Sequence, residues 1–257
     1  MQDLFSVRDK VVLVTGGGQG IGHMITQGFV EAGAKTYISS RKADVVEKVA
    51  ADMSKVGTCI AIPADLGTEA GCKALADDIA SREDKLHVLV NNAGNNWGAP
   101  LDEYPDAAFD RVFALNVKGV FHLTKFLRPL LRKAASDDDP ARVINIGSID
   151  GIKAPFLDTY AYSSSKAAVL HMTRVLARKF AAERITVNAI APGPFESKMM
   201  HETLERFGDA IVGQCPLGRI GRWEDMAGTT IFLSSRAGSY LTGAVIPVDG
   251  GISTDHA

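Results

Sequence analysis

Three side chains suited to proton transfer lie in one stretch of the chain: Ser148, Tyr162 and Lys166. Tyr162 and Lys166 are four residues apart, so in a helix they would share one face. An ammonium beside a phenol favours the phenolate and lowers the tyrosine pKa from about 10. The spacing therefore predicts a tyrosine that exchanges a proton near neutral pH. Without other motifs, a Tyr/Lys pair at this spacing could be coincidental surface packing. Tyr160 is not a candidate, because the residue four positions on, Ser164, carries no charge.

A glycine-rich segment, Thr15-Gly16-Gly17-Gly18-Gln19-Gly20-Ile21-Gly22, follows the apolar run 11–14. Glycines let the backbone approach a pyrophosphate closely, and a helix N-terminus offers it free N–H groups. The spacing G-x-x-x-G-x-G differs from the usual dinucleotide fingerprint G-x-G-x-x-G. A tight strand-to-helix turn without a ligand is the alternative interpretation. Because the segment follows the first expected strand of an α/β chain, we interpret it as a nucleotide site.

The end of the second expected strand reads Ser39-Ser40-Arg41-Lys42. Enzymes that use NAD usually carry Asp or Glu here to bind the ribose 2′-hydroxyl. This chain has no carboxylate to repel a 2′-phosphate and two cations to pair with it. An ordinary basic helix start is the alternative, although cations are unfavourable there. The segment therefore predicts NADP(H) as cofactor.

Elements that could position these groups alternate along the chain. Short, almost continuously apolar runs indicate strands buried on both faces of a parallel sheet. Amphipathic stretches between them indicate right-handed crossover helices. We expect an α/β fold: a Rossmann-like, doubly wound parallel sheet of about seven strands with helices on both faces. The expected strands are 11–14, 36–39, 59–62, 86–90, 143–146, 186–190 and 244–248, and the expected helices are 21–32, 45–53, 70–80, 109–131, 161–182 and 224–233.

No repeat, linker or composition shift divides the chain, so we expect residues 1–257 to form one dinucleotide-binding and catalytic domain. The segment 192–222 has the least regular pattern. Long irregular segments in compact domains are often mobile and functional. We therefore expect a substrate lid at about 193–222.

The composition excludes several other classes of protein. A formal net charge of −2 and a pI near 6.3 argue against a nucleic-acid surface. No apolar run approaches the about 20 residues of a membrane helix, and residues 1–10 lack the apolar core of a signal peptide. The three scattered cysteines predict neither a disulfide nor a metal site, and they fit a cytoplasmic protein.

Over essentially its whole length the chain resembles the short-chain dehydrogenase/reductase family. The motifs that carry the resemblance are Thr15-Gly16-x-x-x-Gly20-x-Gly22, Asp65-Leu66, Asn91-Asn92-Ala93-Gly94, Asn116, Ser148, Tyr162-x-x-x-Lys166 and Pro192-Gly193. The resemblance implies that Tyr162 is the general acid/base and that Ser148 binds the substrate carbonyl. It further implies that Lys166 holds the nicotinamide ribose and lowers the tyrosine pKa, and that Asn116 anchors a relay water.

The same resemblance assigns cofactor contacts along the chain. Asp65 is expected at the adenine, Asn92 and Gly94 along the cofactor, and Pro192-Gly193 at the nicotinamide. The full expected set is Gly16, Gly18, Gln19, Gly20, Ile21, Gly22, Ser40, Arg41, Lys42, Asp65, Leu66, Asn92, Ala93, Gly94, Tyr162, Lys166, Pro192, Gly193, Phe195 and Ser197.

Some of these residues have structural alternatives. Asn92 could tie neighbouring strands together, Asn116 could cap or kink a helix, and Ser148 could be a strand-end turn residue. The chain also departs from the family pattern. Gln19 stands where many NADP enzymes carry a basic residue, and Phe195 stands where an aliphatic residue is usual. Ser197 would replace the common threonine.

Within the family, the chain looks like the β-ketoacyl reductases. We expect an NADPH-dependent reductase of 3-oxoacyl thioesters, with a sugar, polyol or other secondary-alcohol dehydrogenase as the alternative and a nucleotide-sensing regulator as the non-enzyme alternative. The intact Ser148, Tyr162 and Lys166 argue against a sensor, and enoyl reductases space Tyr and Lys more widely. Side chains expected to suit an acyl chain, or simply to pack the lid, are Trp97, Phe156, Leu157, Phe195, Met199, Met200 and Phe207.

Two kinds of partner follow from surface patterns. Basic residues could attract an acidic acyl carrier protein or could be an ordinary solvated face; they are Arg128, Arg132, Lys133, Arg178 and Lys179. Apolar residues surround much of one long helix, and one domain face is unlikely to bury them all; they are Leu115, Val117, Val120, Phe121, Leu123, Phe126 and Leu127. Together with the family resemblance, they predict a homotetramer.

Overall fold

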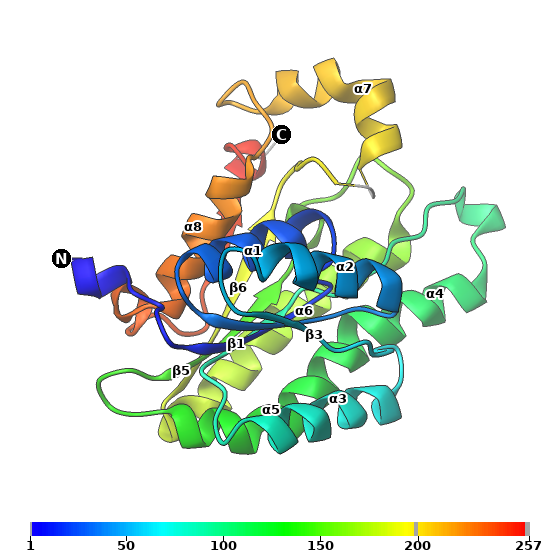
Figure 1. Ribbon diagram of the computed structural model, residues 1–257. Coiled ribbons are helices and arrows are strands. Elements are labelled where there is room, and N and C mark those ends of the chain that lie inside the picture. The colour runs from blue at the N-terminus through cyan, green and yellow to red at the C-terminus, as the bar shows by residue number, and fades with distance from the viewer. Residues whose placement is uncertain (1, 198–199, 255–257) are drawn as a thin grey trace.

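A single parallel sheet of seven strands forms the centre of the computed structural model, which describes residues 2–197 and 200–254 (Figure 1). The strand order is β3-β2-β1-β4-β5-β6-β7. The strands are β1 (Val11–Thr15), β2 (Lys35–Ser39), β3 (Cys59–Ala61), β4 (Val88–Asn91), β5 (Ala141–Ile146), β6 (Ile185–Pro192) and β7 (Val245–Val248). The expected sheet is confirmed, and each expected strand is present with shifted ends.

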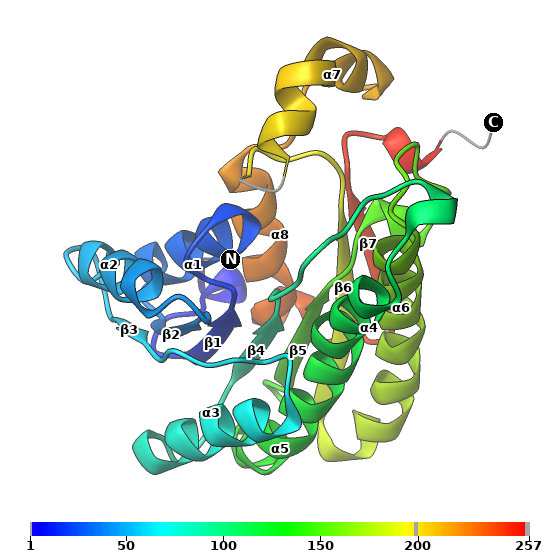
Figure 2. The same cartoon turned by 90° about the vertical axis from the view of Figure 1, so that its right-hand side faces the viewer.

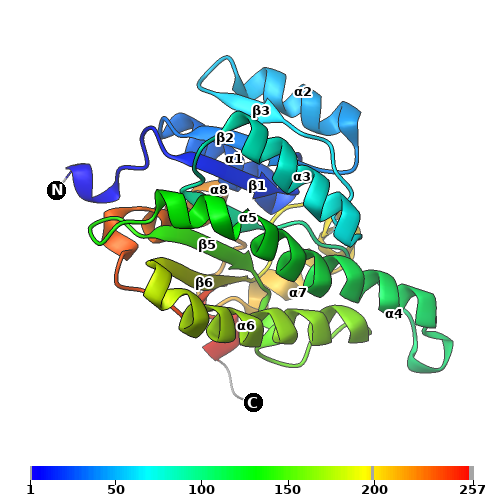
Figure 3. The same cartoon turned by 90° about the horizontal axis from the view of Figure 1, so that it is seen from below.

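Helices cover both faces of the sheet, as Figures 1 and 3 show. One layer contains α1 (Gly20–Glu31), α2 (Ala43–Met53) and α8 (Trp223–Ser234). The other contains α3 (Glu69–Arg82), α5 (Val120–Ala134) and α6 (Tyr160–Phe180), with α4 (Asp106–Phe113) at its end. Two hydrophobic clusters lie between these layers and the sheet. The sheet is thus buried on both faces, as its apolar runs predicted.

Two helical segments differ from the expected pattern. The expected helix 109–131 is divided into α4, a π-helical segment Ala114–Gly119 and α5. The segment expected to be irregular contains α7 (His201–Gln214). No residue of α7, all of which is described, is buried, and α7 stands apart from the helical layers above the sheet (Figure 2). In the described part of the chain, no helix has the length and apolar character that a membrane span needs.

The strand order places several loops at one edge of the sheet. β1 pairs with β2 on one side and with β4 on the other. The strand order therefore runs in one direction from β1 to β3 and in the opposite direction from β4 to β7, and the point of reversal lies between β1 and β4. Ligands of doubly wound sheets bind outside the carboxyl ends of the strands at such a reversal. The loops that follow β1, β4, β5 and β6 therefore define the region where a site is expected.

Candidate active site

The start of α6 carries the two residues with the most informative spacing. Lys166 is buried, and its Nζ donates a hydrogen bond to the Ile146 carbonyl at 2.8 Å. The same Nζ lies 5.4 Å from the centre of the Tyr162 ring. Ser148 lies two residues after the end of β5, and its hydroxyl hydrogen-bonds to Tyr162. The structure thus brings Ser148, Tyr162 and Lys166 together at the carboxyl end of β5.

Burial opposes the charged form of both groups on α6. Tyr162 is partly exposed at its surface, yet the protein around its hydroxyl raises the pKa to about 12, although the Ser148 hydrogen bond lowers it. Burial lowers the pKa of Lys166 to about 8. The expected lowering of the Tyr162 pKa is wrong for this arrangement, because burial of the phenol outweighs it. The ammonium lies over the ring and bonds the Ile146 carbonyl. Tyr162 therefore holds its proton at neutral pH.

Asn116 lies in the π-helical segment between α4 and α5, and its side chain is fully engaged. Its Nδ2 donates to the Asn95 carbonyl and to Ser165 Oγ, both at 3.0 Å, and its Oδ1 accepts from the Asn95 N–H at 2.9 Å. A Cβ on Gly94 would lie 3.3 Å from Asn116 Oδ1 and 3.7 Å from Lys166 Nζ. Gly94 thus lets the loop pass between the two residues. A single π turn of this kind is frequent at functional sites.

The glycine loop has the backbone that a pyrophosphate site needs. Gly16 and Gly20 have φ values of +67° and +53°, which favour glycine. A Cβ on Gly22 would lie 2.1 Å from the Gly16 carbonyl oxygen, so only glycine fits there. Gln19 precedes α1 and makes no side-chain cap. The first N–H groups of α1 therefore remain available to an anion.

The end of β2 offers unpaired polar groups beside that loop. Arg41 and Lys42 are exposed, and within residues 2–197 and 200–254 neither forms an ion pair. The Ser40 hydroxyl donates to the Lys42 carbonyl at 3.2 Å. The Ser39 hydroxyl is fully buried and has no hydrogen-bond partner among the described groups. Ser39 was missed by the sequence analysis, because only its burial distinguishes it from Ser40.

Several expected cofactor residues also have structural tasks. The Asn92 amide donates to the carbonyls of Thr15 at 2.8 Å and Gly16 at 3.3 Å, so Asn92 does tie β4 to β1 and the glycine loop. The Ala93 N–H donates to Thr15 Oγ1 at 2.9 Å. Leu66 is buried in the core, which leaves only its backbone for a ligand.

Asp65 is exposed, and its Oδ1 accepts from the Gly67 N–H at 3.1 Å. Its second carboxylate oxygen has no hydrogen bond to any described residue. Gly18 packs close to α2, where its Cβ would lie 3.3 Å from Val45 Cγ1, and Ile21 is partly buried in the first turn of α1.

The segment after β6 closes one side of the site. Pro192 ends β6, and Gly193 packs on Asp249, where a Cβ would approach within 2.7 Å. Ser197 accepts a hydrogen bond from the Met200 N–H at 3.2 Å. A Cβ on Gly20 would lie 3.0 Å from Ser197 Cβ, so this segment contacts the glycine loop.

Phe195 does not border the substrate region, which corrects one expectation. Its side chain is 1% exposed and packs on Gly221, where a Cβ would lie 2.3 Å from the ring. Only the Phe195 backbone is open to the cofactor. Met199 lies outside the described residues.

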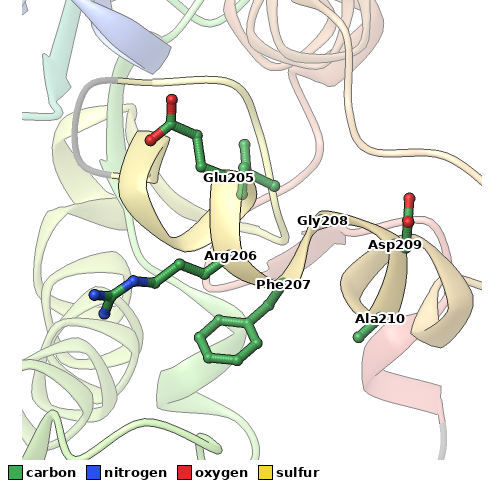
Figure 4. A pocket seen from close by; sticks show the side chains of 7 residues that line it. Glu205, Arg206, Phe207, Gly208, Asp209 and Ala210 are labelled. Carbon is green, nitrogen blue, oxygen red and sulfur yellow. The ribbon is translucent and has the colours of Figure 1, made fainter.

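Most of the other apolar side chains that were expected to suit an acyl chain are exposed. The exposed fractions are 39% for Trp97, 88% for Phe156, 41% for Leu157 and 45% for Phe207, and Met200 is partly buried. Along α7 lies an open hollow of about 340 Å³, lined by residues 204–210 (Figure 4). None of the catalytic candidates lines it, so we do not assign the hollow to the reacting group.

One acid beside the catalytic candidates was missed by the sequence analysis. Asp150 lies two residues after Ser148 and is partly buried. Burial raises its pKa, although the charges of Lys153 and Lys166 oppose the rise. The only sign of Asp150 in the sequence is that an acid lies close to Ser148. The burial that raises its pKa appears only in the folded structure.

Comparisons with known proteins agree with this geometry. Residues 16–253 match a family model described as enoyl-(acyl carrier protein) reductase. The rhamnolipids biosynthesis 3-oxoacyl-(acyl-carrier-protein) reductase of Pseudomonas aeruginosa is 47% identical over 98% of this chain and 99% of that protein. The 3-oxoacyl-(acyl-carrier-protein) reductase FabG of Thermotoga maritima is 34% identical over 95% of this chain and 97% of that protein.

A solved structure is similar over the same length. The Pseudomonas aeruginosa RhlG/NADP active-site complex has a TM-score of 0.95 and 46% identity, and the match covers 98% of this chain and 100% of that chain. The similarity therefore includes the sheet, both helical layers and the segments around the site.

Proposed function

This chain belongs to the short-chain dehydrogenase/reductase family of oxidoreductases, and from that premise we propose that it reduces 3-oxoacyl thioesters to 3-hydroxyacyl thioesters with NADPH. The observation that carries the proposal is the meeting of Ser148, Tyr162 and Lys166 beside the glycine loop. The full-length similarity to 3-oxoacyl reductases supports the substrate class. The description of the matching family model names an enoyl reductase, but a spacing of four between tyrosine and lysine suits ketone reduction.

In the proposed reaction, bound NADPH supplies a hydride to the ketone carbon. The Ser148 hydroxyl donates a hydrogen bond to the ketone oxygen and fixes its position. Tyr162, which holds its proton at neutral pH, gives that proton to the same oxygen. Lys166 holds the nicotinamide ribose and supplies the positive charge beside the phenol. Asn116, fixed by Asn95 and Ser165, holds the loop and the relay water that returns a proton.

The residues present fit NADP(H). The uncapped start of α1 and the positive-φ glycines suit the pyrophosphate. Arg41, with Ser40 and Lys42, suits a 2′-phosphate, and no carboxylate from 39 to 42 would repel it. Asp65 at the adenine, the Asn92–Gly94 turn, Pro192-Gly193 and Ser197 complete the proposed contacts. Leu66 and Phe195 would contribute only their backbones.

We further propose that α7 and its flanking segments form the substrate lid. The support is the absence of any buried residue in this fully described helix, together with exposed Phe207 on its surface. An acyl carrier protein is the proposed carrier. Two residues of the basic patch give this proposal little support, because Arg128 and Arg132 both lie against Glu183. Buried free thiols at Cys59, Cys72 and Cys215 fit the proposed cytoplasmic location.

A homotetramer is the proposed assembly. Of the seven apolar residues expected around the long helix, Val120, Leu123 and Leu127 are buried, and Leu115 and Phe126 pack against the core. Phe121 of α5 and Val175 of α6 remain 45% and 46% exposed on neighbouring outer helices (Figure 3). We expect light scattering at micromolar concentration to give a tetrameric mass, and a monomeric mass would contradict the assignment.

The activity is tested by following NADPH oxidation with a panel of ketones. We expect turnover of 3-oxoacyl thioesters to exceed that of sugar, polyol-derived and steroid ketones. Faster turnover of a polar ketose would favour a sugar or polyol dehydrogenase instead. NADPH binding with no turnover of any ketone would favour a nucleotide-sensing protein.

A further inference from the structure

Asp150 belongs to a turn that contacts two of the proposed catalytic residues, Ser148 and Lys166. It lies in the short 3-10 turn Ile149–Gly151 that joins β5 to the loop before α6. Its backbone N–H donates to Ser148 Oγ at 3.1 Å. A Cβ on the next residue, Gly151, would lie 2.7 Å from the Lys166 carbonyl carbon, so the turn is pressed against α6 at Lys166. This packing fixes Asp150 beside the reaction centre.

The carboxylate of Asp150 has no direct partner among the described residues, although it is partly buried. The charged or titratable groups around it are Lys166 and Tyr162 on α6 and, in the following loop, Lys153. Lys153 Nζ donates to the Ile252 carbonyl at 3.2 Å rather than to the acid. β6, which also packs on the turn, contains no charged residue. The carboxylate can therefore act on its neighbours through its charge rather than through a direct hydrogen bond.

The charge of Asp150 acts on both groups of α6. It raises the pKa of Tyr162, adding to burial, and it raises the pKa of Lys166 against the larger lowering by burial. A negative charge opposes a phenolate and stabilises an ammonium, so both effects have one sign. Each keeps a proton in the site.

We propose that Asp150 is a positioning residue that keeps the proton on Tyr162 and the positive charge on Lys166, so that the site stays in its proton-donating form above neutral pH. The inference rests on the proposed roles of Tyr162 and Lys166. It extends them by assigning the working pH range to a residue outside the proposed catalytic and cofactor-binding sets.

Asp150→Asn removes the charge and keeps the shape of the side chain. Without the charge, the phenolate forms more easily and the ammonium loses its proton more easily, so both ionisations move to lower pH. We expect the alkaline limb of the kcat/KM profile for ketone reduction to move down by about one pH unit. A shift of this size is expected when a charge several ångströms away is removed at an effective dielectric constant of about 20. Asp150→Glu should restore the profile, and Asp150→Ser provides a second neutral variant.

A matched control removes a nearby acid that does not face the site. Asp158 is exposed and accepts a hydrogen bond from the Tyr160 hydroxyl at 2.9 Å. Asp158→Asn should leave the profile of the wild-type protein unchanged. A shift in this control as large as that of Asp150→Asn would overturn the assignment, because any local loss of charge would then suffice.

A second measurement needs neither substrate nor cofactor. NMR of protein labelled with ¹³C at the lysine ε-carbons follows the titration of Lys166, whose signal is identified by its loss in Lys166→Arg. We expect the midpoint to be lower in Asp150→Asn than in the wild type. An unchanged midpoint would overturn the proposal. If activity were then lost equally at every pH, Asp150 would have a structural role, and if only KM were raised, Asp150 would contact the substrate. Absence of ketone reduction by the wild type would refute the proposed function and leave this titration readable.

Discussion

Two helices of this protein, α6 at the candidate site and the proposed lid helix α7, are built in opposite ways. α6 has 21 residues, and it buries polar residues such as Ser165, Lys166 and Thr173 together with an apolar stripe against the sheet. α7 has 14 residues, all described, and buries none of them. Figures 1 and 2 show α6 within a helical layer and α7 standing apart above the sheet.

The difference indicates a division of labour between the two helices. A proton transfer needs groups held at fixed distances, and only a packed helix can hold buried Lys166 against the Ile146 carbonyl. A lid must instead give way to substrates of different size, which an unpacked helix does at little cost. Chemistry is therefore expected to depend on α6 and substrate preference on α7.

The largest effect is expected at Tyr162. Tyr162→Phe removes the proposed proton source while keeping the ring on α6, and such acid–base groups are typically worth about 10²–10⁴-fold in rate. We expect kcat to fall by this factor while NADPH still binds, measured by single-turnover oxidation and by equilibrium titration. Tyr160→Phe, two residues earlier on the same helix, is the control. A nearly normal kcat in Tyr162→Phe would refute the mechanism.

The packing contrast itself is tested by matched truncations. Leu176→Ala on α6 removes a buried side chain and should lower the free energy of unfolding by about 2–5 kcal/mol. Leu204→Ala on α7 removes a partly exposed one and should change it by about 0.5 kcal/mol or less. Urea unfolding of both variants provides the comparison. Equal losses would show that α7 is packed in solution and would break the contrast.

Cofactor choice should depend on neither helix. Arg41→Ala removes a charge-assisted contact to the 2′-phosphate, worth about 1.5–3 kcal/mol, or roughly 10- to 150-fold in the Kd of NADPH. The Kd of NADH should change little, and fluorescence titration measures both. Arg206→Ala removes the same charge from α7 and is the control. Equal use of NADPH and NADH by the wild type would contradict the assignment of the 39–42 segment.

The smallest effect is expected for each added methylene of the substrate. If α7 covers an acyl chain, kcat/KM should rise with 3-oxoacyl length by about 0.8 kcal/mol, or roughly fourfold, per CH₂ until the pocket is full. Phe207→Ala should flatten this rise without changing the rate for the shortest substrate. Val56→Ala, which truncates a residue that is 65% exposed in the turn after α2, is the control. A flat series for the wild type would show that α7 does not set a preference for substrate length.

Local sequence determined much of this molecule. The apolar runs specified seven strands, because strands buried on both faces need continuous apolar residues. The spacing of Tyr162 and Lys166 specified a shared helix face, because residues four apart on a helix are neighbours. The positive-φ backbone at Gly16 and Gly20 was likewise indicated by residue type, because few other residues adopt it.

Other features depended on contacts between distant segments. The segment 201–214 is amphipathic, but prolines and glycines around it masked the helix α7. Asn116 lies in a π-helical turn and hydrogen-bonds to Asn95 and Ser165, which are 21 and 49 residues away in the sequence. Phe195 has the residue type of a substrate contact, and only its packing on Gly221 places it in the core.

Protonation was decided by tertiary structure alone. The sequence places an ammonium near a phenol and so predicts a lowered pKa at Tyr162. Burial instead raises that pKa to about 12, and Asp150, which the sequence shows only as an acid near Ser148, adds to the rise. The physical reason is that residue type and spacing specify which charges are present, whereas their energies depend on how much water the folded chain excludes around them.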